Sequence, residues 1–369
     1  MLQELSTFDK WISADEVRHL LPEGDRPLEV SSEHALATWW QQKTSGTTYI
    51  RCHVPARALP GNSYSLKYSD LKLGEEGEVY VPRNEGTAIW QFVGNATRAL
   101  IMAHLQEQGV RCLMEVDDNY LTPPPPVPNT RGDWSHKLDR SEQDRYSFQA
   151  HRKIIRWVDG IIASTDEIAE RYAKHTSAPI YVCPNSADLD DWPDLPEDAG
   201  RVGKRRHIGF AGSASHRYDV ALVERALDLA ARSGATIHKL GGAMTTWRFP
   251  HESMPWTDDL EQYRRNLQAL DVGLCPLKSG DWQDCKSDLK AIEYVLAGVI
   301  PIVSRTPPYR DWFDLVPTCS TEKEWTKAIR WAVNAPAEEL YDVWQRAYRF
   351  VMDNKLIEHH IDKWRKAIQ

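Results

Sequence analysis

The segment DVGLCPLKSGDWQDCKSDLKAIEYVLAGVIPIVS, residues 271–304, decides the fold class of this 369-residue chain. Two short apolar runs, 271–277 and 299–304, enclose a stretch that begins polar and continues with apolar residues at helical spacing. Short apolar runs bounded by Gly or Pro are typical of buried strands. The segment therefore predicts a strand, a helix and a second strand, which is the repeating unit of a parallel α/β sheet.

The same alternation runs through both halves of the chain. We predict strands within 47–55, 87–94, 110–121, 159–165, 179–192, 207–213, 236–242, 271–277 and 299–304. We predict helices within 95–109, 141–158, 166–175, 218–234, 260–270, 284–298 and 337–368, the last with a break near Asp353 and Asn354. Strands that alternate with helices form parallel, doubly wound sheets. The sequence thus predicts an α/β protein with two Rossmann-like domains and a cleft between them.

Three segments of the chain are expected to differ in role. The stretch PDLPEDAGRVGKRR (193–206) combines Pro, Gly and a switch of charge, which is typical of a domain boundary. We therefore predict an acceptor-side domain at 1–192 and a nucleotide-binding domain at 193–336. The C-terminal helical segment, 337–369, is expected to pack back on the first domain.

Composition favours an ordinary soluble protein. The net charge of −8 argues against charge-driven adhesion to nucleic acids or membranes over a broad surface. The six cysteines are scattered without a C-x-x-C pair, so reduced thiols in the cytoplasm are expected. Neither a signal peptide nor an apolar run long enough to span a membrane is recognisable. The 15 tryptophans are interpreted mainly as core residues, with sugar or base stacking by a few as the alternative.

Lys286, Ser287 and Lys290 stand at the start of the predicted helix, which we expect to begin near Asp284. Cations are unfavourable at a helix N-terminus, where the unpaired N–H groups and the dipole are positive. A bound diphosphate would explain them, held by the N–H groups, the serine hydroxyl and the lysines. One turn further, Glu293 could accept hydrogen bonds from a ribose. The alternative is a solvated face on which these charges pair along the helix.

A second candidate phosphate element is GFAGSASHRYD, residues 209–219. Gly212 and Ser213 follow a predicted strand and precede a predicted helix, which permits close approach of the backbone to an anion. The segment matches neither the Walker A loop nor the G-x-G-x-x-G dinucleotide fingerprint.

These segments together resemble the donor-binding region of retaining GT-B glycosyltransferases, the group that includes glycogen and sucrose synthases. The resemblance covers residues 179–312 and is carried by 271–277, 293–298, the glycine loop and VCPNSADLDDW (182–192). The resemblance implies a metal-independent transferase without a cofactor. Its donor would be a nucleotide-diphosphate sugar, with the UDP type expected before others. The diphosphate and ribose of the donor would be bound by Gly212, Ser213, Lys286, Ser287, Lys290 and Glu293. The CKSDLK version resembles a bacterial and phage subset of the group.

The sequence departs from the family motif Glu-x7-Glu at one position. Counting back from Glu293, the first glutamate is replaced by Cys285, with Asp284 beside it. In the family this glutamate lies near the transferred sugar, so the departure bears on the identity of the sugar. We keep Asp284 as a candidate donor-site residue.

Candidate catalytic and acceptor residues lie in the first half of the chain. Asp117 and Asp118, in EVDDN, are expected to end a strand at the cleft and to position the acceptor hydroxyl; a turn or a GT-A metal site are the alternatives. His53, with Arg51 and Arg57 nearby, is expected to face the cleft or to be structural. A basic and aromatic stretch at 131–156 offers the last candidates, Trp134, Arg140 and Arg145, for an anionic acceptor, or else forms a solvated helix.

The expected activity is hexosyl or pentosyl transfer to a glycan, a small molecule or a modified base in phage DNA, without insertion into a membrane. Two alternatives remain open at this stage. One is a protein that kept the fold and binds a nucleotide sugar or nucleic acid without catalysis. The other is a UDP-sugar epimerase on the same fold. Turnover of the donor separates the transferase from the binding protein, and an epimerase would bind the UDP-sugar without transfer to an acceptor.

Overall fold

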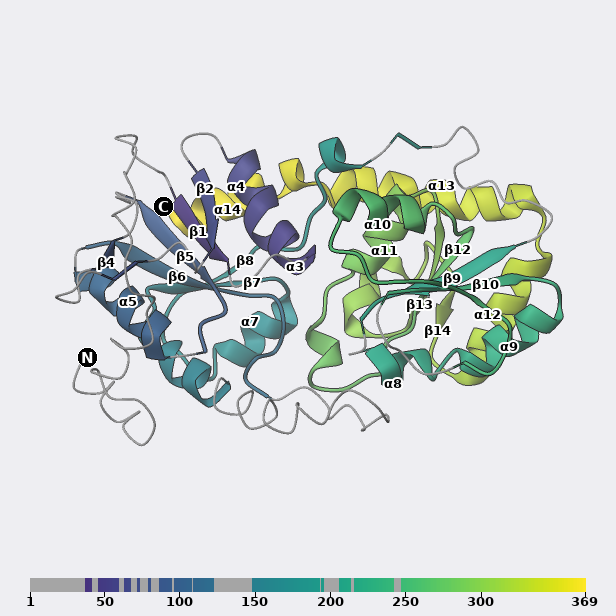
Figure 1. The fold of residues 1–369 in the computed structure, drawn as a ribbon, viewed down its shortest axis with the longest axis horizontal. Coiled ribbons are helices and arrows are strands. Elements are labelled where there is room, and N and C mark those ends of the chain that lie inside the picture. Colours follow the sequence, from purple (N-terminus) through teal and green to yellow (C-terminus); the bar gives the residue numbers. More distant parts are fainter. Residues whose placement is uncertain are drawn as a thin grey trace. The chain divides into compact units, whose positions relative to one another are not determined.

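The structure, a computed structural model, describes residues 37–41, 46–59, 63–67, 72–73, 79–80, 86–94, 96–107, 109–122, 148–192, 194–195, 206–213, 216–241 and 247–369. The chain forms two compact units. One comprises Met1–Pro184 together with His360–Gln369, and the other comprises Asn185–His359. Each unit is built on its own six-stranded parallel sheet (Figure 1). The predicted α/β class with two Rossmann-like domains is confirmed.

The chain passes from the first unit to the second and later returns, and both of these boundaries differ from the expected ones. The first crossing lies at Pro184 and Asn185 instead of near residue 193. Helix α13 (Ala337–Asn354) belongs to the second unit, because its apolar face packs on α11 (Leu289–Leu296) and β13 (Ile300–Ser304). Only α14 (Ile361–Ile368), whose Trp364 is buried, joins the first unit.

The first unit has the strand order β2-β1-β5-β6-β7-β8, and every neighbouring pair is parallel. In that order the strands are Ser63–Lys67, Ala37–Gln41, Thr87–Gln91, Arg111–Val116, Gly160–Ala163 and Ile180–Val182. The described helices between them include α5 (Ala96–Glu107) and α7 (Asp166–Tyr172), and a short antiparallel pair joins β3 (Lys72–Leu73) to β4 (Val79–Tyr80). Gly109 ends the α5 segment at φ +84°, a conformation that favours glycine.

The strand predicted at 47–55 is wrong, because this segment is helical. It consists of α3 (Gly46–Thr48), a π-helical turn η2 (Tyr49–His53) and α4 (Val54–Ala58). The β-branched residues at its start favour a strand locally, but burial of the Arg51 side chain against the sheet overrides that preference. The strand that fills this place in the sheet is β1 (Ala37–Gln41), which the sequence analysis did not predict.

The second unit has the strand order β11-β10-β9-β12-β13-β14, again all parallel. In that order the strands are Glu252–Met254, Thr236–Leu240, His207–Ala211, Val272–Cys275, Ile300–Ser304 and Thr318–Cys319. Its helices are α8 (Arg217–Val220), α9 (Glu224–Arg232), α10 (Leu260–Leu267), α11, α12 (Glu322–Asn334) and α13, with 3₁₀ turns at Leu189–Asp191, Gln283–Cys285, Pro307–Trp312 and Ile357–His359.

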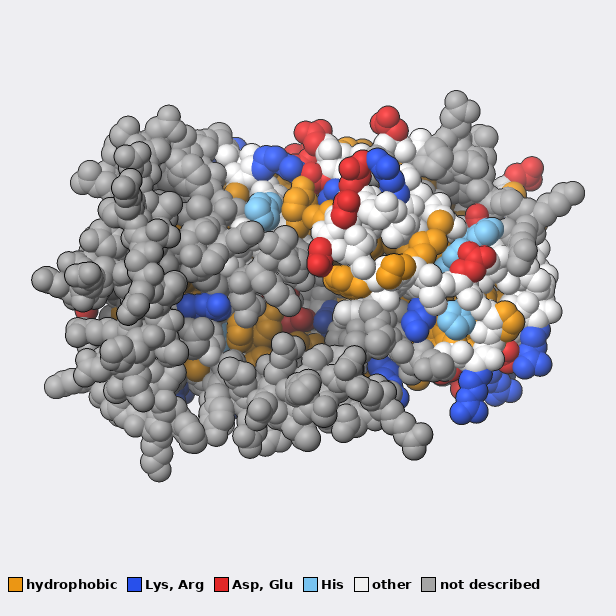
Figure 2. Space-filling view, in the orientation of Figure 1, with side chains coloured by type: hydrophobic (Ala, Val, Ile, Leu, Met, Phe, Trp, Pro, Cys, Tyr) orange, Lys and Arg blue, Asp and Glu red, His pale blue; other side chains and the backbone are white. Residues whose placement is uncertain are grey.

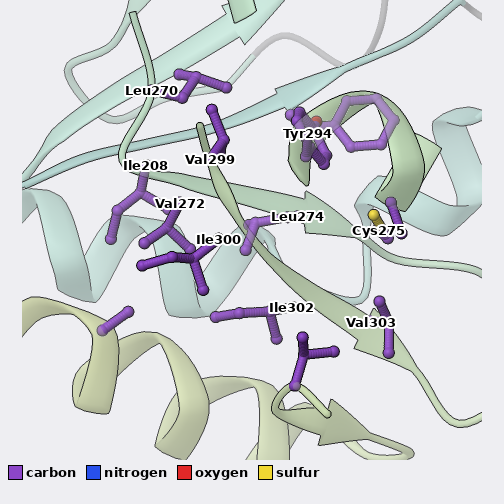
Figure 3. Packing of buried hydrophobic residues seen from close by; sticks show 14 of the residues in the cluster. Ile208, Leu270, Val272, Leu274, Cys275, Tyr294, Val299, Ile300, Ile302 and Val303 are labelled. Atoms are coloured by element: carbon purple, nitrogen blue, oxygen red, sulfur yellow. The ribbon is translucent and has the colours of Figure 1, made fainter. Parts of the chain in front are cut away.

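Aliphatic side chains from neighbouring strands form the core of the second unit. Ile208, Val272, Leu274, Ile300 and Ile302 are completely buried and pack together between the sheet and its helices (Figure 3). Helices α11 and α13 cover one face, and α9 pairs with α12 on the other (Figure 1). The quoted segment 271–304 thus forms β12, α11 and β13, as predicted.

The strand order fixes where each sheet can bind a ligand. In the second unit the chain moves outward from β9 to β10 on one side and from β12 to β13 on the other. In the first unit the corresponding reversal lies between β1 and β5. Ligands of open α/β sheets bind beyond the carboxyl ends of the strands at this switch point. Ligand binding is therefore expected at the loops that follow β9 and β12 in the second unit and β1 and β5 in the first.

Candidate functional site

The CKSDLK segment does not form one continuous helix, which corrects the predicted start near Asp284. A 3₁₀ turn covers Gln283–Cys285, and Lys286 is extended at φ −66° and ψ 162°. Helix α11 begins at Leu289. Lys286 and Ser287 therefore lie in the turn that leads into the helix, and Lys290 lies in its first turn. All three still converge on the helix N-terminus, although not as one face of a helix.

The N-terminus of α11 lacks the cap that its sequence offers. Asp288 occupies the N-cap position, but its side chain makes no capping hydrogen bond. Its carboxylate instead accepts a hydrogen bond from Trp312 Nε1 at 2.8 Å and pairs with the Lys355 ammonium at 2.9 Å. Of the first three N–H groups of the helix, that of Leu289 lies 3.5 Å from Ser287 Oγ and that of Ala291 donates to Asp288 O at 2.9 Å. Within the described residues the N–H of Lys290 has no acceptor, so this end of the helix is suited to an anion.

Ser287 is held in place from a distant part of the chain. Asn185 Nδ2 donates a hydrogen bond to Ser287 Oγ at 2.7 Å. Asn185 belongs to the segment that enters the second unit, and Ala187 pairs there with the backbone on both sides of Leu356. The asparagine of the predicted 182–192 motif therefore orients a hydroxyl at the turn that leads into α11.

Lys290 joins α11 to the end of β9. Its ammonium donates to the carbonyl oxygen of Ala211 and lies 4.9 Å from the centre of the Phe210 ring. The Tyr294 hydroxyl accepts a hydrogen bond from Ala211 N at 2.9 Å, one helical turn further on. Burial lowers the pKa of Lys290, and the nearby positive charge of Lys286 acts in the same direction. A negatively charged ligand would relieve both effects.

The glycine loop after β9 depends on two glycines in contact. A Cβ at Gly212 would lie 2.8 Å from the Phe210 ring, and a Cβ at Gly241, where φ is +107°, would collide with the Gly212 carbonyl oxygen. Gly212 N donates to Leu240 O at 3.0 Å, which fixes the loop on the neighbouring strand. The predicted pair Gly212 and Ser213 therefore lies at the carboxyl end of β9, at the switch point.

Glu293 and Asp284 each have a hydrogen-bond donor of their own. Tyr263 donates from its hydroxyl to Glu293 Oε2 at 2.9 Å, and burial raises the pKa of Glu293. Asp284 accepts from Ser279 Oγ at 3.1 Å and is partly exposed, whereas Cys285 is fully buried. The position of the family's first glutamate is thus occupied by a thiol in the core, and the neighbouring carboxylate is tied to the loop after β12.

Two polar residues at this site were missed by the sequence analysis. Asp219, only 1% exposed, accepts from Lys278 N at 2.9 Å and bonds to His216 Nδ1 at 3.0 Å. Ser304 Oγ, at the end of β13, accepts from Leu277 N at 2.7 Å. Both bonds fix the loop that follows β12. The aspartate could have been noticed as a charged residue amid an apolar helix pattern.

In the first unit, polar side chains also gather at the switch point. Thr48 donates to Gln91 Oε1 at 2.9 Å, at the end of β5, and His53 Nε2 lies 3.3 Å from Gln41 Oε1, at the end of β1. The His53 ring stacks on Tyr49 with centroids 5.7 Å apart. The structure thus places His53 at the carboxyl edge of the sheet, on a helix instead of after a strand.

Asp117 and Asp118 follow β6, as predicted, and take part in a tight turn. Tyr120 donates from its hydroxyl to Asp117 Oδ1 at 2.6 Å, and its N–H bonds to Asp118 O at 2.9 Å. Phe92 packs on Tyr120 with ring centroids 4.3 Å apart and has φ +40°; it is the one non-glycine residue with positive φ in the described part of the chain. Strain of this kind is characteristic of functional edges but does not define a reaction.

Arg51, noted in the sequence beside His53, is committed to the core. Its Nε donates to Glu115 Oε1 and its Nη1 to Cys183 O, both at 2.6 Å, and the guanidinium lies 5.1 Å from the centre of the Trp364 ring. Both members of the ion pair are fully buried. Burial raises the pKa of Glu115 to about 7 despite this partner. Arg51 therefore joins four segments of the first unit and is not placed to contact a substrate.

The predicted acceptor residues Trp134, Arg140 and Arg145 lie outside the described residues. Within the residues that are described, no three His, Cys, Asp or Glu side chains are grouped so that they could hold a metal ion. In the same part of the chain, no helix is long and apolar enough to cross a membrane.

The six cysteines, all within the described ranges, are buried thiols and form no disulfide. On the face shown in Figure 2, the described surface carries both acidic and basic side chains, so anion binding there would depend on local cations.

No protein-family model and no curated protein sequence matches the chain. Solved structures do. Anabaena HepE, in complex with UDP-glucose, superposes with a TM-score of 0.61 at 11% identity, over 90% of this chain and 98% of HepE. WaaG, a glycosyltransferase involved in lipopolysaccharide biosynthesis, gives 0.55 at 14% identity, over 90% of this chain and 99% of WaaG.

TarM gives a TM-score of 0.53 at 10% identity over 76% of this chain, and the chain spans about half the length of TarM, 54%. At identities this low the superpositions establish the fold. Each unit supplies one parallel α/β sheet, in agreement with the two-domain design of these neighbours. The chain therefore has the fold of the GT-B glycosyltransferases.

Proposed function

We propose that this protein transfers a sugar from a nucleotide-diphosphate sugar, of the UDP type, to an acceptor hydroxyl. The observation that carries the proposal is the uncapped N-terminus of α11 at the switch point of the second unit. Lys286, Ser287 and Lys290 converge on it, and the Asp288 carboxylate is bonded elsewhere. The neighbours HepE and TarM, whose complexes contain UDP-glucose and UDP, support this assignment of the donor.

The chemistry asked of the site is stabilisation of a leaving diphosphate. Cleavage of the bond between sugar and phosphate leaves a negative charge on the nucleoside diphosphate. Fixed ammonium groups and helix N–H groups stabilise such a charge because they are oriented before the reaction begins. We propose that these groups serve in place of a metal ion. Transfer with retention, in which the leaving phosphate accepts the acceptor's proton, is part of the same proposal.

The acceptor would be a hydroxyl group bound at the carboxyl edge of the first unit. His53, Asp117 and Asp118 are proposed to position it there, because His53 contacts Gln41 at the end of β1 and the two aspartates follow β6 at the same edge of the sheet. A glycan is the acceptor class we favour, since WaaG is involved in lipopolysaccharide biosynthesis and a TarM variant forms a complex with fondaparinux and alpha-GlcNAc-glycerol. Small molecules and modified DNA belong in the same screen.

Calorimetric titration with UDP, in EDTA, tests the donor site directly. We expect the wild-type protein to bind UDP and Lys286→Ala to lose at least about tenfold in affinity, because a hydrogen bond to a charged group contributes about 1.5–3 kcal/mol. Lys327→Ala, which removes an exposed lysine on α12, should bind like wild type. UDP binding that appears only with added Mg²⁺ would contradict the metal-free site. Turnover of UDP-sugars with acceptors then separates a transferase from a binding protein.

A further inference from the structure

A histidine and a buried aspartate form a dyad beside the glycine loop of the second unit. His216 Nδ1 lies 3.0 Å from Asp219 Oδ2. Asp219 is held in turn, since its other oxygen accepts from Lys278 N at 2.9 Å. Because a carboxylate can only accept, the Nδ1 atom of the neutral ring carries the proton. The Nε2 atom is then an acceptor with a free lone pair.

The other edge of the imidazole ring faces the anion site. A Cβ built on Gly212 would lie 3.2 Å from His216 Cδ2, the carbon bonded to Nε2. The ring also meets the edge of Phe210, with centroids 5.8 Å apart, and Phe210 is the ring over which the Lys290 ammonium lies. Within the described part of the chain, Nε2 has no hydrogen-bond partner. His216, Lys290 and the Gly212 backbone thus surround one small region at the carboxyl end of β9.

The imidazole of His216 is held neutral in a place suited to an anion. Burial, together with the ammonium groups of Lys290 and Lys286, lowers the pKa of His216 to about 4 against the opposing effect of Asp219. These are the charged groups that face the ring, from α8, α11 and the turn before α11. A diphosphate between the ring and the lysines would reverse the balance, because it favours a protonated imidazole.

We propose that His216, oriented by Asp219, takes up one proton from solvent when the donor binds and donates a hydrogen bond from Nε2 to the donor diphosphate. His216 would thus contact the diphosphate as a third cation beside Lys286 and Lys290, and it would be charged only while the donor is bound. This role rests on the proposed function and adds a pH dependence to it. Donor affinity rises as the pH falls, because the complex holds one more proton than the separate partners.

Proton uptake can be measured by titrating the protein with UDP-glucose in buffers of different ionisation enthalpy. UDP-glucose is the right probe because both of its phosphates are diesters and do not titrate near neutral pH, unlike the terminal phosphate of UDP. We expect wild type to take up between about half and one proton per UDP-glucose at pH 7. Its affinity should rise on the order of tenfold from pH 8 to pH 6.5.

His216→Gln isolates the contribution of the dyad, because the amide can donate from the position of Nε2 but cannot take a proton. In this variant we expect the uptake to vanish and the affinity to change less than about twofold over the same pH range. His175→Gln, which removes an exposed histidine of the first unit, should retain the uptake of wild type. Thermal melting checks that each variant is folded. If His216→Gln does not fold, His216→Asn takes its place, because the asparagine amide can keep the bond to Asp219.

The outcomes separate this role from the function on which it rests. Wild type that binds UDP-glucose without proton uptake refutes the role of His216 and leaves the donor site standing. Uptake that persists in His216→Gln assigns the proton to another group, such as Lys290, and equally refutes the role. A wild-type protein that binds neither UDP-glucose nor UDP refutes the donor site itself.

Discussion

Each sheet of this protein holds a cation near the carboxyl ends of its strands, and the two cations are treated in opposite ways. Arg51 is fully buried and paired with Glu115, also fully buried. Lys290 donates to the carbonyl of Ala211, while Glu293, one turn along α11, is bonded to Tyr263 instead. A cation with its own carboxylate is neutralised within the fold. A cation bonded only to a carbonyl keeps its charge for a ligand.

The largest effect that would test this contrast is on the stability of the first unit. Arg51→Met should lower the free energy of unfolding by about 3–5 kcal/mol, because removal of one partner leaves a buried carboxyl and a carbonyl without their donor. Urea unfolding followed by tryptophan fluorescence measures the loss. Arg225→Met is the matched control, since its pair with Glu322 is exposed and contributes less than about 1 kcal/mol.

The same variant has a definite pH dependence. The pKa of Glu115, raised to about 7 by burial beside Arg51, should rise further without the cation. When the pKa of a carboxyl is higher in the folded protein than in the unfolded chain, the free energy of unfolding falls as the pH rises from the unfolded pKa to the folded one. The free energy of unfolding of Arg51→Met should therefore continue to fall above pH 7. Arg51→Met combined with Glu115→Gln should remove that slope. A loss below about 1 kcal/mol in the unfolding free energy of Arg51→Met would show that the ion pair between Arg51 and Glu115 does not stabilise the first unit substantially.

A second test compares His151 of the first unit, which is buried, with His216 of the second unit, which is half-buried. Both nitrogens of His151 are engaged, by Val93 O at 3.1 Å and by the Tyr172 hydroxyl at 2.8 Å, and burial lowers its pKa from 6.5 to about 4. Between these values the unfolded chain binds more protons, so stability falls as the pH falls from 6.5 to 4. The loss due to His151 approaches about 3 kcal/mol.

His151→Gln should remove this acid-dependent loss, measured as the difference between wild type and variant in unfolding free energy at pH 4.5 and pH 7. Saturating UDP-glucose should leave the His151 effect unchanged, while it changes the corresponding effect of His216→Gln. This result would show that UDP-glucose affects the surroundings of His216 in the second unit and not those of His151 in the first. An equal response of both histidines to UDP-glucose would contradict this difference between the two units.

The fold and the candidate donor site could be approached from the sequence because their signals are local. Buried parallel strands such as 271–277 and 299–304 are short apolar runs, and the glycine loop at Gly212 follows one of them directly. The turn before α11 was predicted as helix because the helical spacing of Leu289 and Ile292 was extended backwards. What stops the helix there is the engagement of Asp288 by Trp312 and Lys355, two partners far away in the sequence.

The first unit was harder to predict because its key contacts are between distant segments. The helix at 46–58 contradicts the local preference for a strand, and it is fixed by bonds from Arg51 to Glu115 and to Cys183, 64 and 132 residues away. No local pattern reports such pairs. The His216–Asp219 dyad escaped notice for a different reason. Its spacing is local, but its meaning depends on burial and on the lysines that face it.

The smallest of the three effects concerns Lys290 and is the most direct test of the contrast. Lys290→Met keeps the length and apolar stem of the side chain but removes its charge. We expect UDP affinity to fall about 30-fold, equivalent to about 2 kcal/mol for a hydrogen bond to a charged group. The free energy of unfolding should change by less than about 1 kcal/mol or rise, because burial already disfavours the ammonium.

Arg51→Met and Lys290→Met are therefore the same kind of substitution with opposite expected outcomes. If the two units differ as described, the first variant loses stability and keeps UDP binding, while the second keeps stability and loses UDP binding. Calorimetric titration and urea unfolding on both variants decide the matter. If Lys290→Met instead unfolds as readily as Arg51→Met and the folded fraction still binds UDP with wild-type affinity, then Lys290 is a structural cation, and Lys286 with the helix N–H groups must hold the diphosphate alone.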